Sequence, residues 1–269
     1  MLVFLFSACP KPQTRGSANR LLALQLVDSL RLPGQAVGLC SDRDELLLAD
    51  NMGTNIYRVD LDLKLRPPIA LPARVPGLRC LAADPFFVYL FDATRLFRFD
   101  RSRGTMNQAS SNVQGHSAVA LSSGQLAFSD GFSDRILILD PSGTMSDYNV
   151  QVSLQPGGIT FGPDGNFYVL DQMRQSVMIL NRVGSLVRSF ALPGPSLRIA
   201  VDDSLSVYLL ERAGGRIWQV DRHNSVATIS AAELGVNLAA TDMVVSSPWL
   251  YLLSHGQYLL KLHLPRSGD

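Results

Sequence analysis

The sequence has almost no excess of charge of either sign. It holds 24 lysines and arginines against 23 acidic residues, which leaves a formal net charge of +1. A chain without a strong positive field has no general attraction for nucleic acid, and one without an acidic excess has none for a basic partner. We therefore expect no nucleic acid among its partners.

Cysteine is also scarce. Cys9, Cys40 and Cys80 are too few for a disulfide framework, and no CxxC pair is present for zinc or redox chemistry. A disulfide between Cys40 and Cys80 and a pair of buried free thiols are both compatible with the sequence. The nucleophile elbow, the zinc-protease motif and the phosphate loop are absent as well.

Long hydrophobic runs are missing. No apolar stretch approaches the roughly 20 residues with which a helix spans a bilayer. No amphipathic stretch long enough for a helix competes with the strand patterns. Hydrophobic residues nevertheless make up 46% of the chain and charged residues 17%, which is typical of a globular protein with a sizeable core.

The amino-terminal segment differs from the rest. MLVFLFSA precedes Cys9, and the polar stretch PKPQTRGSANR follows it. This order resembles the lipobox of bacterial lipoproteins, in which the signal is cleaved before a cysteine that then carries lipid. A positive n-region is lacking, and the apolar run is short for a secretory signal. We expect residues 1–21 to be a signal or lipobox-like segment and tether, with Cys9 lipidated. The protein would then be membrane-anchored in the bacterial cell envelope, facing the periplasm or the exterior.

A repeat of about 40 residues organises the remainder of the chain. One strand type ends in an acid in five units, as ELLLAD, VYLFD, QLAFSD, NFYVLD and SVYLLE, and in serine as WLYLLS in the sixth. A second type follows in the same register, as NIYRVD, RLFRFD, RILILD, SVMILN, RIWQVD and YLLKLH. Each unit opens with a turn and a small, apolar strand and closes with a variable strand. The unit is therefore four short antiparallel strands.

Units of this size and pattern are typical of β-propeller blades. Six units fill residues 33–264, but the last has only three strands, while LQLVDSLRLP supplies an unassigned strand before the first. The sequence thus predicts that residues 22–32 complete the last blade, because closure of the ring removes exposed sheet edges. We predict an all-β fold, a monomeric six-bladed β-propeller of four-stranded antiparallel blades over residues 22–269.

The repeated segments resemble a known family. DGFSDRILILDPSG, ERAGGRIWQVD and PGGITFGPDGNFYVLD are similar to NHL-repeat propellers, over about residues 22–264. The resemblance concerns the repeat and implies little about activity. The recurring acids, Asp130 among them, are expected to be structural, because an aspartate at a strand end accepts N–H bonds from its own turn.

Binding is the function that these observations favour. In a propeller, the loops between blades and those linking the second and third strands gather on one face. Arginine, aromatic and methionine side chains there suit a recognition surface. The candidate ligand- or partner-binding residues are Asn51, Arg95, Phe132, Arg135, Met173, Arg174, Arg212 and His255. We expect a non-catalytic binding or scaffold module for a protein or glycan, without catalytic residues, metal or cofactor.

The alternative is a metal-dependent, lactonase-like hydrolase or lyase with its site in the central channel. The gluconolactonase and senescence-marker family and the peptidylglycine amidating lyases share the six-bladed fold, and this likeness implies a divalent metal in the channel. The first inner strand, AVGLCS, lacks the early glutamate of the first group. The second group needs several histidines, and only His116 and His255 could face the same end of the channel here.

Overall fold

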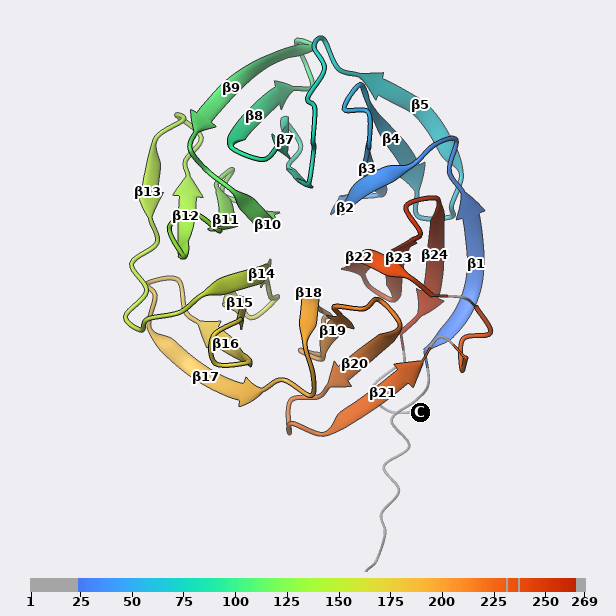
Figure 1. The fold of residues 1–269 in the computed structure, drawn as a ribbon, viewed down its shortest axis with the longest axis vertical. Coiled ribbons are helices and arrows are strands. Elements are labelled where there is room, and N and C mark those ends of the chain that lie inside the picture. The colour runs from blue at the N-terminus through green and yellow to red at the C-terminus, as the bar shows by residue number, and fades with distance from the viewer. Residues whose placement is uncertain (1–23, 231, 237, 265–269) are drawn as a thin grey trace, which may run out of the picture.

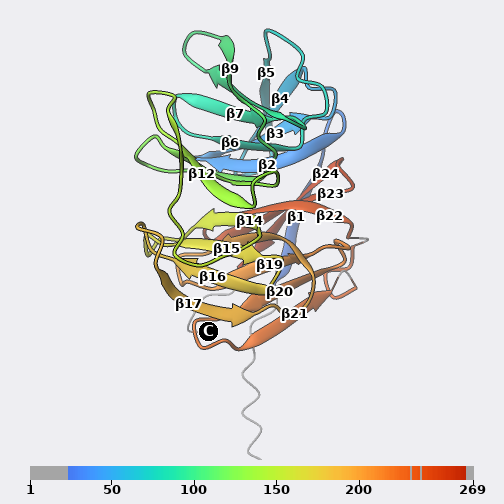
Figure 2. The same ribbon diagram turned by 60° about the vertical axis from the view of Figure 1, so that its left-hand side comes forward.

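The computed structural model describes residues 24–230, 232–236 and 238–264, and these form six four-stranded antiparallel sheets arranged in a ring (Figure 1). The predicted all-β, six-bladed β-propeller is confirmed, and the described residues contain no helix. The blades are numbered here in chain order, each from its inner to its outer strand. Figure 2 shows the ring from a tilted direction.

Blade 1 comprises β2 (Ala36–Asp42), β3 (Glu45–Asp50), β4 (Asn55–Asp60) and β5 (Leu65–Ala70). Blade 2 comprises β6 (Cys80–Ala83), β7 (Phe87–Phe91), β8 (Arg95–Asp100) and β9 (Thr105–Ser111). Blade 3 comprises β10 (Gly115–Ala120), β11 (Leu126–Asp130), β12 (Arg135–Leu139) and β13 (Met145–Asp147). Blade 4 comprises β14 (Pro156–Phe161), β15 (Phe167–Asp171), β16 (Ser176–Leu180) and β17 (Leu186–Ala191). Blade 5 comprises β18 (Ser196–Val201), β19 (Val207–Glu211), β20 (Arg216–Val220) and β21 (Val226–Ser230). Blade 6 comprises β22 (Ala240–Ser246), β23 (Trp249–Ser254), β24 (Tyr258–His263) and β1 (Gln25–Arg31).

The first and last strands of the described chain close the ring. β1 is the outer strand of blade 6 and pairs antiparallel with β24, from Gln25 opposite His263 to Arg31 opposite Tyr258. In Figure 1 these two strands lie side by side, although they stand at opposite ends of the colour scale. The predicted closing strand is therefore confirmed.

The hydrophobic core is divided into six clusters, one at each interface between neighbouring blades. In β3, Leu46 and Leu48 join the cluster shared with blade 6, while Leu47 and Ala49 join the cluster shared with blade 2. Both faces of this strand are covered, and all its positions are buried. This explains why the middle strands read as continuous apolar runs rather than alternating ones.

The repeated acids act as expected at the ends of the second strands. Asp130 accepts the backbone N–H of Gln114 at 2.6 Å and that of Ser133 at 3.0 Å. Asp171 likewise accepts the N–H of Gln155 at 3.2 Å and that of Met173 at 3.0 Å. Each carboxylate therefore joins its own loop to the turn that opens its blade. The sequence interpretation of these two acids as structural is confirmed.

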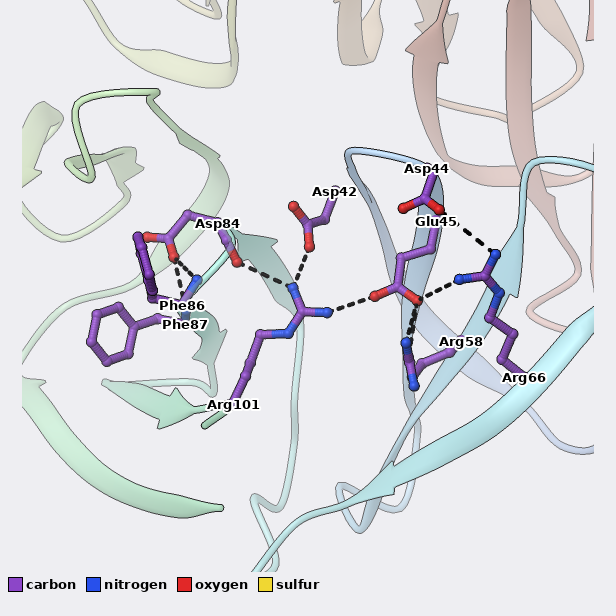
Figure 3. Close-up of polar contacts among 9 residues, drawn as sticks. All are labelled: Asp42, Asp44, Glu45, Arg58, Arg66, Asp84, Phe86, Phe87 and Arg101. Carbon is purple, nitrogen blue, oxygen red and sulfur yellow. Dashed lines mark hydrogen bonds and ion pairs between the residues drawn. The ribbon is translucent and has the colours of Figure 1, made fainter. Parts of the chain in front are cut away.

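A buried charge cluster links blades 1 and 2 at the end of the ring where the β2–β3 turn lies (Figure 3). Glu45 is only 3% exposed, and its carboxylate contacts Arg58 at 2.8 Å, Arg66 at 3.8 Å and Arg101 at 2.6 Å. Arg101 comes from blade 2 and also contacts Asp42. Because a buried carboxylate without partners is costly, the arginine that crosses between blades should matter most for stability.

The described residues do not include the predicted membrane anchor. The described part of the chain has no helix that is both long and apolar enough to cross a bilayer. Residues 1–21, and with them Cys9, lie outside the described residues. The lipobox-like terminus, the lipid anchor and the envelope location therefore stay predictions.

Replacing Arg101 by methionine should destabilise the protein by about 3 kcal/mol, because it removes a cross-blade partner of the buried Glu45. Arg103→Met is the matched control. That side chain is 79% exposed and contacts Asp100 at 3.8 Å, so its loss should cost less than about 1 kcal/mol. Urea unfolding of both variants measures the two changes. Equal free energies of unfolding would show that the cluster contributes nothing beyond a surface ion pair.

Removing residues 1–32 should lower the free energy of unfolding by more than about 4 kcal/mol, because Leu24 and Leu32, 3% and 5% exposed, leave the core. The bare edge of β24 should also promote association between molecules. Thermal unfolding and light scattering measure the two effects. Val27→Ser, at a position 53% exposed on β1, should leave both unchanged. A truncated chain as stable as the whole one would exclude β1 as the closing strand.

Candidate functional site

The inner strands of the six blades surround a narrow central channel. A cavity of about 230 Å³ in it is lined mainly by small and apolar side chains. Its polar lining includes Cys40, Cys80, Ser117, Arg198 and Asp242. The channel therefore offers few polar groups along its length.

An ion pair joins three blades inside this channel. The Nε of Arg198, in blade 5, donates to Oδ1 of Asp242, in blade 6, at 2.9 Å. The other oxygen of Asp242 accepts the N–H of Leu39, in blade 1, at 3.1 Å. The attraction of Asp242 is the main cause that raises the pKa of Arg198 above its ordinary value. The ion pair between the two side chains thus holds neighbouring inner strands together.

The two channel cysteines are free thiols. Burial is the main cause that raises the pKa of Cys80 to about 12. Burial, followed by the nearby Cys80, raises the pKa of Cys40 well above its ordinary value. Since the thiolate is the reactive form, neither group is suited to act as a nucleophile near neutral pH. The sequence allowed either a Cys40–Cys80 disulfide or two free thiols, and the structure has the free thiols.

Bulges mark one end of the inner strands, where the loops after the second strands lie. In blade 3, Gly115 pairs with Asp130 and Ser117 with Ser129, so His116 is an extra residue in the ladder. Blades 5 and 6 have corresponding shifts near Leu197 and Thr241. A bulge changes the direction of a side chain relative to the regular alternation. It thereby frees a residue such as His116 from the inter-blade core.

A cavity of about 550 Å³, called the channel mouth here, opens at this end. Its wall is built from the start of β10 and β18, the loops after β11, β15 and β19, and the turns before β6 and β14. The side chains that line it and carry charge or hydrogen-bonding groups are Arg79, His116, Asp134, Gln155, Gln172, Arg198 and Arg212.

Two glycines make room for side chains of the mouth. A Cβ atom at Gly131 would lie 2.5 Å from Nε2 of His116, and one at Gly157 would lie 2.3 Å from Nε2 of Gln172. Such distances are far below van der Waals contact. The imidazole therefore lies directly against glycine backbone of its own blade 3, and the amide against glycine backbone of its own blade 4, which holds both at the wall of the cavity.

The surroundings of His116 favour its neutral form. The pKa of this imidazole is lowered from its ordinary value of 6.5, first by partial desolvation at the wall of the mouth and then by the positive charge of Arg198. Arg79 acts in the same direction, while Asp130 and Asp134 oppose it. A neutral imidazole at pH 7 can accept a proton, which is the property that a general base requires.

The residues of the channel do not fit the divalent metal of the catalytic alternative. Among the residues that the structure describes, no three His, Cys, Asp or Glu side chains are grouped so that they could hold a metal ion. The carboxylate of Asp242 is already engaged by Arg198 and by a backbone N–H. No metal-dependent step is therefore assigned to this site.

Most residues predicted from the loop face lie away from the mouth. Of the eight, only Arg212 lines it. The side chain of Asn51 donates to that of Gln35, and Phe132 and Met173 are 57% and 64% exposed. His255 is exposed in the loop between β23 and β24.

Three of the predicted arginines are paired with acids. Arg95 contacts Asp92 at 2.6 Å and Arg135 contacts Asp147 at 2.5 Å. Arg174 contacts Asp171 at 2.8 Å.

The residues predicted from the sequence did not include Arg79, Gln172 or Arg198, and His116 was a candidate only for the catalytic alternative. A usable signal was present. Arg79 and His116 stand directly after the turns that open their blades, and Arg198 follows its turn by a few residues. Polar residues are unexpected there, because the inner strands are otherwise small and apolar.

Native Cys40 and Cys80 should react with a thiol reagent at pH 8 at least about 100-fold more slowly than in the urea-unfolded chain, because their raised pKa values leave little thiolate. A Cys9→Ser background leaves only these two thiols to be followed. Labelling of the native protein as fast as that of the unfolded chain would show that the channel thiols are not desolvated.

Comparison with known proteins identifies relatives by fold only. No protein-family model matches the sequence, and no curated protein is significantly similar to it. A virginiamycin B lyase from Staphylococcus aureus has a similar structure, with a TM-score of 0.64 and 14% identity, over 88% of this chain and 99% of that one. A gluconolactonase from Xanthomonas campestris has a TM-score of 0.65 and 14% identity, over 90% and 95% of the two chains. The aldose sugar dehydrogenase of Streptomyces coelicolor, bound to PQQ, has a TM-score of 0.65 and 14% identity, over 90% and 98%.

These neighbours overturn the expectation of a non-catalytic binding or scaffold module. The similar structures named above are enzymes, so they favour the catalytic alternative. Three arginines of the expected recognition surface, Arg95, Arg135 and Arg174, are also held by aspartates of their own blades. At these identities the comparisons establish the six-bladed β-propeller fold, while the NHL-repeat assignment stays a prediction.

Proposed function

We propose that this protein is a hydrolase or lyase that cleaves a small molecule bound at the channel mouth, with His116 as the general base. The observation that carries the proposal is the position of this imidazole. It lies against Gly131 in a cavity of about 550 Å³, and its surroundings keep it neutral. A cavity of this size suits a small-molecule ligand.

The chemistry follows from the charges around the imidazole. His116 would take a proton either from a water that attacks an ester or lactone carbonyl, or from a carbon next to the bond that breaks. Negative charge then develops on a substrate oxygen. The guanidinium group of Arg198, held in place by Asp242, lines the same cavity and would donate a hydrogen bond to that oxygen. Such preorganised charge acts only weakly on a neutral ground state, so it favours the transition state.

Neighbouring polar groups would orient the substrate. Arg212 donates from Nη2 to Oε1 of Gln172 at 2.7 Å, and Nε2 of Gln172 lies 3.4 Å from the carbonyl oxygen of Ser196. These contacts fix the orientation of the amide at the wall of the mouth. The lyase and the gluconolactonase that share the fold support this class of reaction.

A panel of small esters and lactones tests the proposal. On the substrate that is cleaved, His116→Asn should lower kcat by at least about 100-fold, because the base is lost while the shape is nearly kept. His223→Asn is the matched control, since His223 is exposed in the turn between β20 and β21. Its kcat should not change.

The rate should also depend on pH in a defined direction. The neutral imidazole is the active form, and its pKa is lowered, so kcat/KM should rise with pH through a midpoint below 6.5 and then stay level. A midpoint above 6.5, or full activity of His116→Asn, would exclude His116 as the base.

A further inference from the structure

Three arginines of the loop face are neutralised within the chain. Arg95, Arg135 and Arg174 each contact an aspartate at 2.8 Å or less. An arginine held in this way contributes little attraction to an anionic ligand. An arginine of the channel mouth can attract an anion only if no acidic side chain neutralises its guanidinium group.

Arg79 has no such partner. It is exposed in the turn before β6, and its backbone N–H donates to the carbonyl oxygen of Phe91 at 2.8 Å. Within the part of the chain that the structure describes, its guanidinium forms no ion pair or hydrogen bond. Its charge nevertheless acts on the mouth, since Arg79 lines the cavity and is among the causes of the lowered His116 pKa.

Arg212 has only a neutral partner. Its hydrogen bond goes to the amide oxygen of Gln172, and that amide packs against Gly157. The contact positions the guanidinium without cancelling its charge. The remaining N–H groups of Arg212 are left for other acceptors, which suits a planar, bidentate ligand.

The charge balance of the mouth is therefore positive. Arg198 is compensated by Asp242, which leaves Arg79 and Arg212 against the single carboxylate of Asp134 among the lining residues. Both uncompensated groups are guanidinium groups, and both come from loops of different blades. Guanidinium is the side chain best matched to the geometry of a carboxylate.

We propose that the substrate of this protein carries a carboxylate group, which Arg79 and Arg212 bind at the channel mouth. This inference rests on the proposed function: the carboxylate end of the substrate binds the two arginines while the reacting end of the same molecule lies at His116. The two arginines are binding and specificity-determining residues. A neutral analogue of the substrate would lose both charge-assisted contacts.

Binding of matched probes to the full chain tests the inference by calorimetry. The pairs are D-glucuronate with D-glucose and benzoate with benzamide, which differ mainly in the carboxylate. At least one carboxylate should bind 10-fold or more tightly than its neutral counterpart, and salt should weaken it. Arg79→Gln and Arg212→Gln should each raise that Kd by about 10-fold, whereas Arg103→Gln, an exposed residue outside the mouth, should not.

Two results would overturn the inference. One is the absence of any carboxylate preference in both pairs. The other is tighter binding of inorganic phosphate than of either carboxylate, lost in the same arginine variants, which would make the mouth a phosphate site.

The inference and the proposed function can fail separately. If neither carboxylate is preferred but His116→Asn is inactive, the carboxylate inference is wrong and the proposed function is retained. If carboxylates bind through the two arginines but His116→Asn is fully active, the mouth is a carboxylate-binding site and His116 is not the general base.

Discussion

The packing of blade against blade is the constraint on which the rest of the structure depends. Each blade buries both faces, so it needs a neighbour on either side, and six interfaces carry six separate hydrophobic clusters. Such an arrangement is complete only as a closed ring. Most buried side chains are apolar, and buried charged groups are held by partners. Examples are Glu45 with its three arginines between blades 1 and 2, and Arg198 with Asp242 between blades 5 and 6.

The same packing determines where chemistry can occur. Side chains of the middle strands are committed to the clusters, and the outer strands face solvent on much of their surface. The inner strands converge on the channel, where space admits mainly small residues. Where a bulge interrupts the ladder of an inner strand, as at His116, a larger polar side chain can leave the core and reach the mouth. Glycines 131 and 157 then provide the space that such side chains occupy.

The sequence predicts the fold well because the fold is repetitive. The acid at the end of each second strand recurs in register, and the surplus strand over residues 24–33 matches a deficit in the last unit. The site is harder to predict because it depends on departures from the repeat. A bulge cannot be read from alternation in a strand of four to seven residues, so His116 and Arg198 look like ordinary members of inner strands.

The prediction of a recognition surface from loop residues has a related limit, because it too depends on three-dimensional contacts. The choice of Arg95, Arg135 and Arg174 as a recognition surface gave their exposure in loops more weight than the pairing with nearby acids that the sequence also allows. Their acidic partners lie in their own blades, and residue order alone does not show which of the possible pairs form. Arg79 and Arg212 line the mouth and have no such acidic partner within the described chain, and both properties depend on the three-dimensional arrangement.

Ring closure through β1 also sets an order of events during synthesis. β1 leaves the ribosome before every other strand described here, yet its partner β24 is made last. Five complete blades can therefore form while β1 waits without a hydrogen-bonding partner. During that interval the nascent chain presents an unpaired strand at its front, which is a hazard for association with other chains. Most side chains of β1 are exposed, and several are polar. This composition suits a strand that must remain in solution until the last blade has formed.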